Sequence, residues 1–281
     1  MKYLSLFSGV GGFELGIHRA TEDAGCFGYS EIDKYAIQTY EKNWKGHTNY
    51  GDAARINPED LPDFDLLVGG FPCQAFSIAG KRKGFDDTRG TLFFDIARIL
   101  AHKRPRHLVL ENVKGLLSHD SGKTIQTIAQ VLSDLGYRIE WQVLNAKNFG
   151  VPQNRERIFI VGHLRGECAG QIFPITADNQ KATFGTIHRS YHKGQHTGSY
   201  VATAPTLRAT EHKRGDNQTS VVEPDARIRR LTPRECERLM SWEDDYTAGV
   251  SDTQRYKQCG NGVVSNVVQA VIEKMLEVKC L

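Results

Sequence analysis

The segment that decides the fold is YLSLFSGVGGFELGIHRA, residues 3–20. Its first five residues, from Tyr3 to Phe7, are mostly apolar and are typical of a buried strand. The stretch SGVGG at 8–12 ends that strand, and apolar residues at helical spacing begin at Phe13. A strand, a glycine-rich corner and a helix in this order are typical of the first unit of a doubly wound α/β fold.

The same alternation of patterns continues to about residue 165. Further strands are expected at 27–32, 65–68, 106–110, 137–144 and 157–162, and helices at 34–44, 92–101 and 124–135. Repeated alternation predicts a parallel sheet with helices on both faces, so we expect an α/β protein with a Rossmann-like doubly wound sheet. Two later helices are expected: one at 232–240, capped by Thr232, and a final one after Gly262 whose valine stripe belongs to the core.

Composition excludes several classes of protein. Of the 281 residues, 40% are hydrophobic and 25% are charged, which is ordinary for a globular chain and unlike collagen, disordered segments or disulfide scaffolds. No apolar run approaches the roughly 18–20 residues of a membrane span, and no signal-peptide core follows Met1. The six cysteines include no C-x-x-C pair, so we expect reduced thiols and no metal site.

The positive charge of the chain is local. The formal net charge is +3, but residues 181–215 alone contain six Lys or Arg against one acid, Glu211. The surrounding stretch, 163–226, has no helical pattern and is rich in Gly, Thr and His. We expect a separate small module there, rich in loops and short strands, whose charge suits the phosphates of a nucleic acid.

The glycine corner is a candidate ligand site. Glycines let a ligand approach the backbone, and the helix that follows offers N–H groups and the positive end of its dipole. Glu31 comes about 20 residues later, where doubly wound folds place an acid on ribose hydroxyls. Dinucleotide and adenosyl cofactors share this spacing, and Glu14 stands where G-x-G-x-x-G has its last glycine. The alternative is a tight turn with a surface acid.

Three further segments place reactive side chains at strand ends. The strand at 65–68 leads through Gly69-Gly70 to Pro72-Cys73-Gln74, which favours a nucleophilic cysteine over an inert one. The strand at 106–110 delivers Glu111 to the same edge, although many such acids only cap a helix. In QNRER, residues 153–157, alternate side chains face one way on a strand, unless the run is only a solvated charged surface.

Together these motifs resemble one family. FSGVGG at 7–12, EID at 31–33, GD at 51–52, PCQ at 72–74, ENV at 111–113, QNRER at 153–157, RLTPRE at 230–235 and GNGVV at 260–264 stand in the order of the cytosine carbon-5 DNA methyltransferases. The resemblance is to a compact bacterial or phage enzyme and covers residues 1–165 and 228–275. It implies a methyltransferase fold with a small target-recognition domain.

The resemblance implies a covalent mechanism. Cys73 would add to carbon 6 of cytosine and so make carbon 5 nucleophilic. Glu111 would bond ring nitrogen 3 and the exocyclic amine. Arg157, with Arg155, would hold the carbonyl oxygen of the base. The base that removes the carbon-5 proton is not identified.

The implied methyl donor is S-adenosyl-L-methionine, which leaves as S-adenosyl-L-homocysteine. The residues that match the family's cofactor contacts are Phe7, Gly9, Gly11, Gly12, Glu31, Ile32, Asp52, Leu92, Asn261 and Val263. Because Asn261 is far from the glycine corner in sequence, the last helix is expected to return to the first strand.

The implied partner is double-stranded DNA with its target cytosine flipped out of the stack. The expected DNA contacts are Gln74, Ser77, Lys81, Arg82, Arg89, Lys193, Thr206, Leu207 and Arg208. We expect a catalytic domain at 1–162 plus 252–281 and a target-recognition domain with its hinge at 163–251. A monomer in the cytoplasm of a prokaryotic or phage-infected cell is expected, with a cognate restriction endonuclease as an open question.

Other functions explain less of the sequence. A tRNA methyltransferase shares the fold, but that branch has Thr where this chain has Ser77. A nicotinamide oxidoreductase leaves Pro72-Cys73-Gln74 unused, and a non-catalytic DNA-binding relative has no need of Cys73, Glu111 and Arg157.

Overall fold

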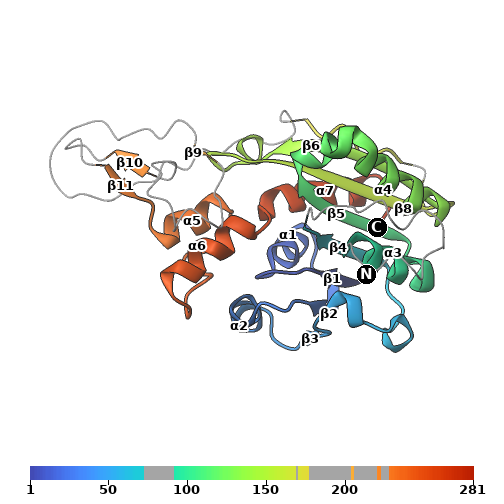
Figure 1. Ribbon diagram of the computed structural model, residues 1–281, viewed down its shortest axis with the longest axis horizontal. Helices are drawn as coiled ribbons and strands as arrows, with labels where there is room; N and C mark the ends of the chain where they lie inside the picture. Colours follow the sequence, from blue (N-terminus) through green and yellow to red (C-terminus); the bar gives the residue numbers. More distant parts are fainter. Residues whose placement is uncertain (73–91, 169, 177–203, 206–219, 223–227) are drawn as a thin grey trace.

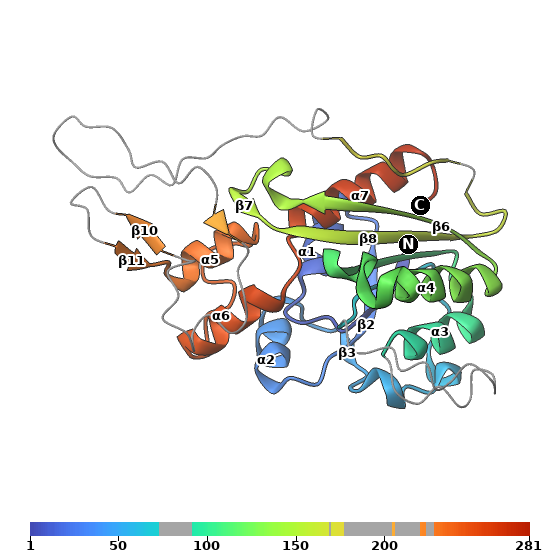
Figure 2. The same ribbon diagram turned by 45° about the horizontal axis from the view of Figure 1, so that its top comes forward.

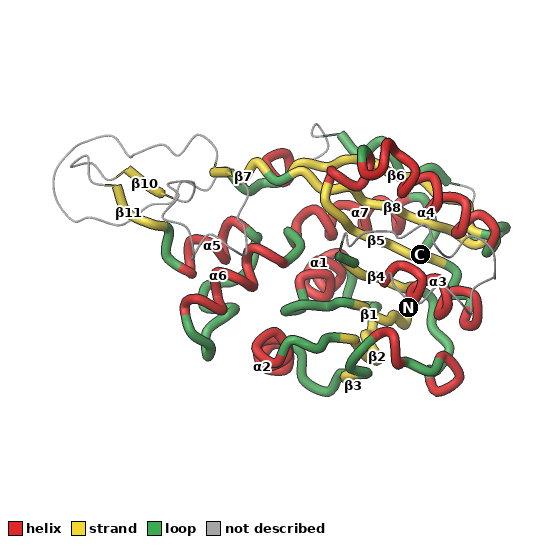
Figure 3. Tube along the Cα trace, in the orientation of Figure 1, coloured by secondary structure: helices red, strands yellow, loops and turns green. Residues whose placement is uncertain are grey.

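The computed structural model describes residues 1–72, 92–168, 170–176, 204–205, 220–222 and 228–281. Its centre is a seven-stranded sheet of order β3-β2-β1-β4-β5-β8-β6 with helices on both faces (Figures 1 and 3). The strands are β1 (Lys2–Leu6), β2 (Gly25–Ser30), β3 (Thr48–Asn49), β4 (Leu66–Gly70), β5 (His107–Val113), β6 (Tyr137–Asn145) and β8 (Glu156–Leu164).

The sheet is mixed rather than wholly parallel. Strands β1 to β5 pair in parallel, whereas β8 is antiparallel to both of its neighbours, β5 and β6. The prediction of a parallel sheet is therefore wrong at this edge. Only residues 146–155 connect β6 to β8, and a parallel crossover needs a dozen residues or more.

Each face of the sheet has its own hydrophobic core. On one face pack α1 (Gly12–Ala20), α2 (Lys34–Asn43) and α7 (Ser265–Glu277), and on the other pack α3 (Leu92–Lys103) and α4 (Lys123–Asp134). Successive strand residues point to opposite faces, so Leu66 and Val68 of β4 join the first core and Leu67 joins the second. The expected doubly wound α/β fold is confirmed.

The last helix was expected to return to the first strand, and it packs against α1, the helix that follows that strand. A Cβ added at Gly16 of α1 would lie 2.6 Å from Cβ of Val268 in α7, so the two helices touch without room for a side chain. The Ser265 hydroxyl donates to the carbonyl oxygen of Gly12 at 2.9 Å. The C-terminal segment thus belongs to the same core as the glycine corner.

Helices α5 (Pro233–Leu239) and α6 (Asp252–Asn261) lie at one end of the molecule (Figure 2). Thr232 and Glu235 form the expected capping box at the start of α5. Helix α6 was not predicted, because its sequence DTQRYKQCGN has few apolar residues and no apolar stripe. The shorter elements are β7 (Gln153–Asn154), β9 (Ala204–Pro205), β10 (Ser220–Val222), β11 (Ile228–Arg230), and the 3₁₀ turns η1 (Ala53–Arg55), η2 (Pro58–Asp60), η5 (Lys114–Leu117), η6 (His119–Gly122) and η7 (Ala146–Asn148).

Two cysteines are joined, against expectation. Cys168 and Cys280 form a disulfide with their Cα atoms 4.9 Å apart, so the prediction of six reduced thiols is wrong for this pair. The two residues are 112 positions apart in sequence and meet only because α7 carries the C-terminus back to the end of β8. Among the described helices, none combines the length and the apolar character needed to cross a membrane.

Candidate active site

The glycine corner follows the carboxyl end of β1 and turns sharply. Gly9 and Gly11 have φ angles of 57° and 90°, in the left-handed region that glycine adopts without strain. A Cβ at Gly11 would lie 2.2 Å from Nε1 of Trp44, and one at Gly12 would lie 2.9 Å from a methyl group of Val263. Among the described residues, nothing lies within 4 Å of a Cβ built at Gly9, so that face of the corner is open to a ligand.

Glu31 ties the end of β2 to this corner. One of its carboxylate oxygens accepts the Gly9 N–H at 2.9 Å, and the other accepts the N–H groups of Ile32 and Asp33, both at 2.8 Å. A carboxylate has about four lone-pair sites, so three such bonds leave capacity for a hydroxyl donor. This is the position at which the sequence predicts a ribose contact.

The neighbouring residues present an apolar surface at the same edge. Ile32 is 72% exposed, which is unusual for a large apolar side chain beside a polar corner and suits a flat ring such as adenine. Asp52 follows β3, and its carboxylate accepts the Ala54 N–H at 3.0 Å while its side chain stays 40% exposed. Leu92 begins α3, and the exposed Asn261 ends α6.

Two aromatic residues that the sequence analysis missed close the back of the corner. The Tyr246 hydroxyl donates to the carbonyl oxygen of Val10 at 2.9 Å and accepts the indole N–H of Trp44 at 2.9 Å. Burial raises the pKa of Tyr246, so the hydroxyl keeps its proton for this bond. No motif marks either residue, and they meet only in the folded chain.

Glu111 and Arg157 form an ion pair at the carboxyl end of β5. Arg157 lies on β8, opposite Val113, and its Nε is 3.0 Å from Oε1 of Glu111. The two side chains are only 17% and 12% exposed. Burial raises the pKa of Glu111, and the nearby Arg157 and Arg155 oppose that shift. The pair is therefore a partly desolvated acid held by a fixed cation.

Arg155 has a different environment from Arg157. It is 2% exposed, and its Nη2 donates to the carbonyl oxygens of Gly260 and Gly262 at 3.0 and 2.6 Å. Gln153 donates instead to the carbonyl oxygen of Leu239 at 2.8 Å. Gln153 lies in β7 and Arg157 in β8, so residues 153–157 are not one continuous strand.

Arg155 and Arg157 still share one space. Both line a cavity of about 10 Å³ that Val263 closes from the C-terminal segment. A volume of this size is about that of one water probe, so the space admits one small group at most. The cavity joins the two arginines to the segment that carries Asn261 and Val263.

The segment that leads to Cys73 starts beside Glu111. Gly70, the last residue of β4, pairs in register with Glu111. The buried Asn112 side chain donates to the carbonyl oxygen of Phe71 at 2.8 Å. This bond fixes the backbone of Phe71, the residue that follows Gly70. This role of Asn112 is not evident from the sequence, although the residue stands in the ENV motif. Outside the described residues lie Cys73, Gln74, Ser77, Lys81, Arg82, Arg89, Lys193, Thr206, Leu207 and Arg208.

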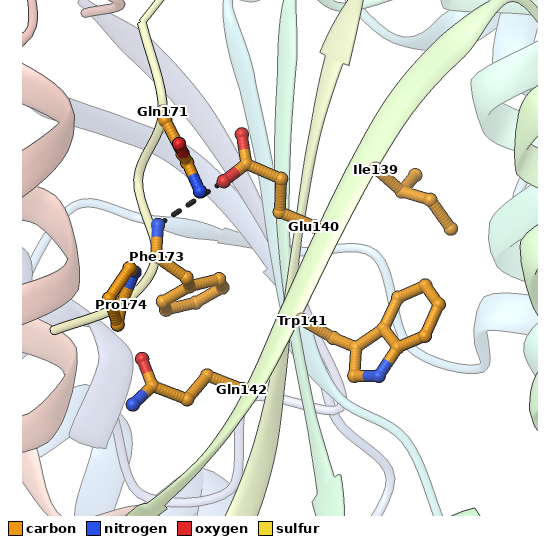
Figure 4. Close-up of a pocket in the computed structure, with 7 residues that line it drawn as sticks. All are labelled: Ile139, Glu140, Trp141, Gln142, Gln171, Phe173 and Pro174. Carbon is orange, nitrogen blue, oxygen red and sulfur yellow. Dashed lines mark hydrogen bonds between the residues drawn. The ribbon is translucent and has the colours of Figure 1, made fainter.

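A larger cavity, of about 450 Å³, lies elsewhere, on the edge strand β6. Figure 4 shows that Glu140 and Gln142 point from β6 toward the segment 171–174, whereas Ile139 and Trp141 point away from it. The Glu140 carboxylate accepts the N–H groups of Ile172 and Phe173 at 3.0 and 3.2 Å. These polar groups hold a chain segment against the sheet, and the described residues that line the cavity include no nucleophile.

Comparison with known proteins places the chain in one family. The family described as C-5 cytosine-specific DNA methylase matches residues 1–184 and 169–277. The chain is 42% identical to the type II methyltransferase M1.ScrFI of Lactococcus lactis subsp. cremoris, over 99% of this chain and 78% of that one. It is 40% identical to M.NlaX of Neisseria lactamica, over 98% and 96% of the two chains, and 36% identical to M.HhaI of Haemophilus parahaemolyticus, over 96% and 93%.

Solved structures show the same fold. The Dnmt2 methyltransferase of S. pombe superposes with a TM-score of 0.78 at 20% identity, covering 99% of this chain and 98% of that one. A DNMT2 mutant of Spodoptera frugiperda also gives a TM-score of 0.78, at 16% identity over 98% and 99% of the two chains. On the evidence of its sequence, the chain belongs to the C-5 cytosine-specific DNA methylases and is a DNA cytosine-5 methyltransferase.

Proposed function

We propose that the enzyme transfers a methyl group from S-adenosylmethionine to carbon 5 of a cytosine flipped out of duplex DNA, through a covalent adduct with Cys73. The observation that carries this proposal is the Glu111–Arg157 pair, held 3.0 Å apart at the edge where the Cys73 segment begins. An acid with a raised pKa beside a fixed guanidinium suits the recognition of a cytosine ring by its nitrogen 3 and its carbonyl oxygen.

Chain connectivity keeps Cys73 near this pair. Cys73 is three residues after Gly70, and three residues span at most about 11 Å. Gly70 lies directly beside Glu111, and a Cβ added at Gly70 would be 3.2 Å from Oε2 of that carboxylate. This chain length allows the thiol of Cys73 to reach a base bound between Glu111 and Arg157.

The other thiols are poor candidates for a nucleophile. Burial raises the pKa of Cys26 to about 12 and raises that of Cys259 well above its usual value. A buried thiol with a raised pKa supplies little thiolate at neutral pH. Cys168 and Cys280 are joined to each other, and Cys236 is buried. This leaves Cys73 as the cysteine best placed for attack.

Glu111 has two tasks in the proposed reaction. Its protonated form donates to ring nitrogen 3 as the Cys73 thiolate adds to carbon 6, so that negative charge does not build up on the ring. Its other oxygen accepts from the exocyclic amine, which distinguishes cytosine from a base with a carbonyl there. Arg157 holds the carboxyl group in place and donates to the carbonyl oxygen of the base.

The cofactor residues fit an adenosyl group. S-adenosylmethionine, when bound, supplies an electrophilic methyl group to carbon 5. The open face at Gly9, the spare acceptor capacity of Glu31 and the exposed Ile32 match a chain, a ribose and an adenine in that order. Phe7, Gly11, Gly12, Asp52, Leu92, Asn261 and Val263 complete the proposed cofactor site.

The remaining assignments rest on the family resemblance. We assign residues 1–162 and 252–281 to catalysis and 163–251 to target recognition, with the basic stretch 181–215 on DNA phosphates. We assign the enzyme to the cytoplasm of a bacterial or phage-infected cell, because methylases of bacteria and phages are among its relatives. Action as a monomer, with or without a partner endonuclease, is part of the same proposal.

The test is a trapping experiment. A duplex with 5-fluorocytosine at the target should form a covalent complex with the wild-type chain, because fluorine cannot leave as a proton. Cys73→Ala should form none and should lower methyl transfer to DNA by about 10⁴-fold or more, while cofactor affinity stays within about twofold. Cys26→Ala is the matched control and should trap normally.

Two outcomes would contradict the proposal. An adduct formed by Cys73→Ala would assign the nucleophile to another residue. Methyl transfer to a tRNA transcript but not to duplex DNA would assign the substrate to the RNA branch of the fold. Bisulfite sequencing of plasmid from cells that express the chain would show the methylated cytosines and their flanking bases.

A further inference from the structure

A second group of reactive side chains lies at the opposite end of the central strands from the active site. His107 begins β5 and pairs in register with His163 of β8. Their Nδ1 atoms are 2.9 Å apart and share one hydrogen bond. Glu111 is four positions after His107 along β5, which is about 13 Å of strand. The group therefore does not belong to the methylation site.

Two cysteines complete the group. Cys168 follows β8, and Cys280 follows α7 at the C-terminus. A ring nitrogen of His163 and the two sulfur atoms all lie within 4.8 Å of one another, and of the residues that the structure describes, only these three form such a set. Ligands of a tetrahedral zinc lie about 3.5–3.8 Å apart, given Zn–S and Zn–N distances of about 2.3 and 2.0 Å. Once the disulfide is reduced, small movements of the three side chains bring their ligand atoms to that spacing.

The histidine ring has a nitrogen without a partner. His163 is 1% exposed, and its Nε2 makes no hydrogen bond, although its Nδ1 bonds His107. A buried polar atom without a partner costs about 1–3 kcal/mol, so it calls for a ligand. If the His163 Nδ1–H donates to Nδ1 of His107, the Nε2 of His163 carries a lone pair, which is the form that binds a metal.

We propose that the reduced chain binds one zinc ion through Nε2 of His163 and the sulfur atoms of Cys168 and Cys280. A dithiol reductant opens the disulfide and is itself oxidised to a disulfide, and the two thiols then lose their protons as the ion binds. Three protein ligands leave the fourth position of the tetrahedral zinc to a water molecule. Thiolate and imidazole ligands together select zinc over magnesium or calcium, which prefer oxygen.

The proposed ion joins the C-terminus to the sheet. Cys280 is 4% exposed, and a Cβ added at Gly170 would lie 2.7 Å from Cβ of Val278, so the two segments already touch. Zinc bound there would hold the end of α7 against β8, as the disulfide does in the oxidised chain. His107 is a positioning residue, because it fixes the tautomer of His163 without touching the metal.

The experiment uses the full chain without an affinity tag, reduced and then freed of reductant and metal under argon. Zinc should bind at one ion per chain, and cobalt in its place should give thiolate-to-cobalt absorption. Cys168→Ser and Cys280→Ser should lose that absorption, and His107→Phe should weaken zinc binding by about 10- to 100-fold. The matched control Cys26→Ser should bind as the wild type does, and the oxidised chain should show no thiolate-to-cobalt absorption.

A second measurement needs no variant. The reduced wild-type chain is alkylated with and without zinc, and its peptides are mapped by mass spectrometry. Zinc should protect Cys168 and Cys280 and leave the reactivity of Cys73 unchanged. Equal alkylation of Cys168 and Cys280 in both samples would overturn the proposal, as would a double variant, Cys168→Ser with Cys280→Ser, that keeps the zinc stoichiometry and the cobalt absorption.

Discussion

The polar groups at the two ends of the central strands differ in what they bind. At the carboxyl ends, Gly9 is open, Glu31 keeps acceptor capacity and Ile32 is 72% exposed. At the amino end of β6, the Tyr137 hydroxyl instead donates to a group of the protein itself, the carbonyl oxygen of Pro105, at 2.7 Å. The catalytic end keeps groups available for the substrate and the methyl donor, whereas at the other end the Tyr137 hydroxyl serves stability and no group takes part in methylation.

The backbone of the glycine corner is strained. The turn after β1 holds three residues with positive φ, namely Phe7, Gly9 and Gly11, and one of them is not a glycine. A left-handed Phe7 carries strain of about 1–3 kcal/mol, which the surrounding packing has to hold. Ligand sites tolerate such strain because the strained backbone directs N–H groups toward the ligand. In a regular helix or sheet these groups would be hydrogen-bonded within the protein. This comparison predicts that mutations at the carboxyl ends change catalysis or binding, whereas those at the amino ends change stability.

The largest effect is expected at Arg157. Arg157→Met removes the cation beside Glu111 and should lower kcat by about 10²- to 10³-fold, as the loss of a donor to developing charge does. Burial raises the pKa of Glu111, and the positive charge of Arg157 lowers it. Removing Arg157 should therefore raise the pKa of Glu111 further. The catalytic form is the protonated acid, which is lost as pH rises through the pKa. The alkaline limb of the pH–rate profile should therefore move to higher pH in the variant.

Single-turnover methylation across a pH series measures both effects. Arg165→Met, at an exposed arginine beyond β8, is the control and should keep the wild-type profile. A variant with a lower rate and an alkaline limb at the wild-type pH would mean that Glu111 is not the titrating acid.

The next effect is expected at Glu31. Glu31→Ala removes an acceptor of about 1–3 kcal/mol and should weaken cofactor affinity by about 5- to 150-fold, with similar turnover at saturation. Glu31→Gln keeps one oxygen acceptor, so its cofactor affinity should lie between those of the wild type and Glu31→Ala. Isothermal calorimetry with S-adenosylhomocysteine measures the change, and Glu59→Ala, at an exposed acid, is the control. Unchanged affinity in both Glu31 variants would remove the adenosyl group from this corner.

The parts of the fold that the sequence predicted depend on local patterns. The glycine corner, the amphipathic helices and the capping box of Thr232 each lie within about twenty residues, and all are confirmed. The antiparallel position of β8 was missed, because strand order depends on contacts between distant segments. Helix α6 was missed for a related reason, since packing against α5 rather than its own pattern stabilises it.

The same limit applies to the site. Glu111 and Arg157 were found because each stands in its own short motif, and the structure brings them together. The bonds from Arg155 to Gly260 and Gly262 join residues more than 100 positions apart, and no single-sequence pattern contains them. For the same reason, the sequence did not predict the contact of Trp44 with Tyr246 or the pairing of Cys168 with Cys280.

The smallest effect is expected at Tyr137, at the amino end of the sheet. Tyr137 is 1% exposed, and Tyr137→Phe keeps its ring while removing the donor to the carbonyl oxygen of Pro105. The expected loss is about 1 kcal/mol of folding free energy, or roughly 2 °C in Tm for a chain of this size, because one buried acceptor is left unpaired. Urea denaturation and a thermal scan measure the loss, and kcat for DNA methylation at saturating cofactor should stay within about twofold of the wild-type value. Tyr137→Leu, which also leaves a void, should lose more stability with the same kcat. A Tyr137→Phe variant with normal stability and a lower kcat would show that the two ends of the sheet are coupled, and the division of labour between them would then be wrong.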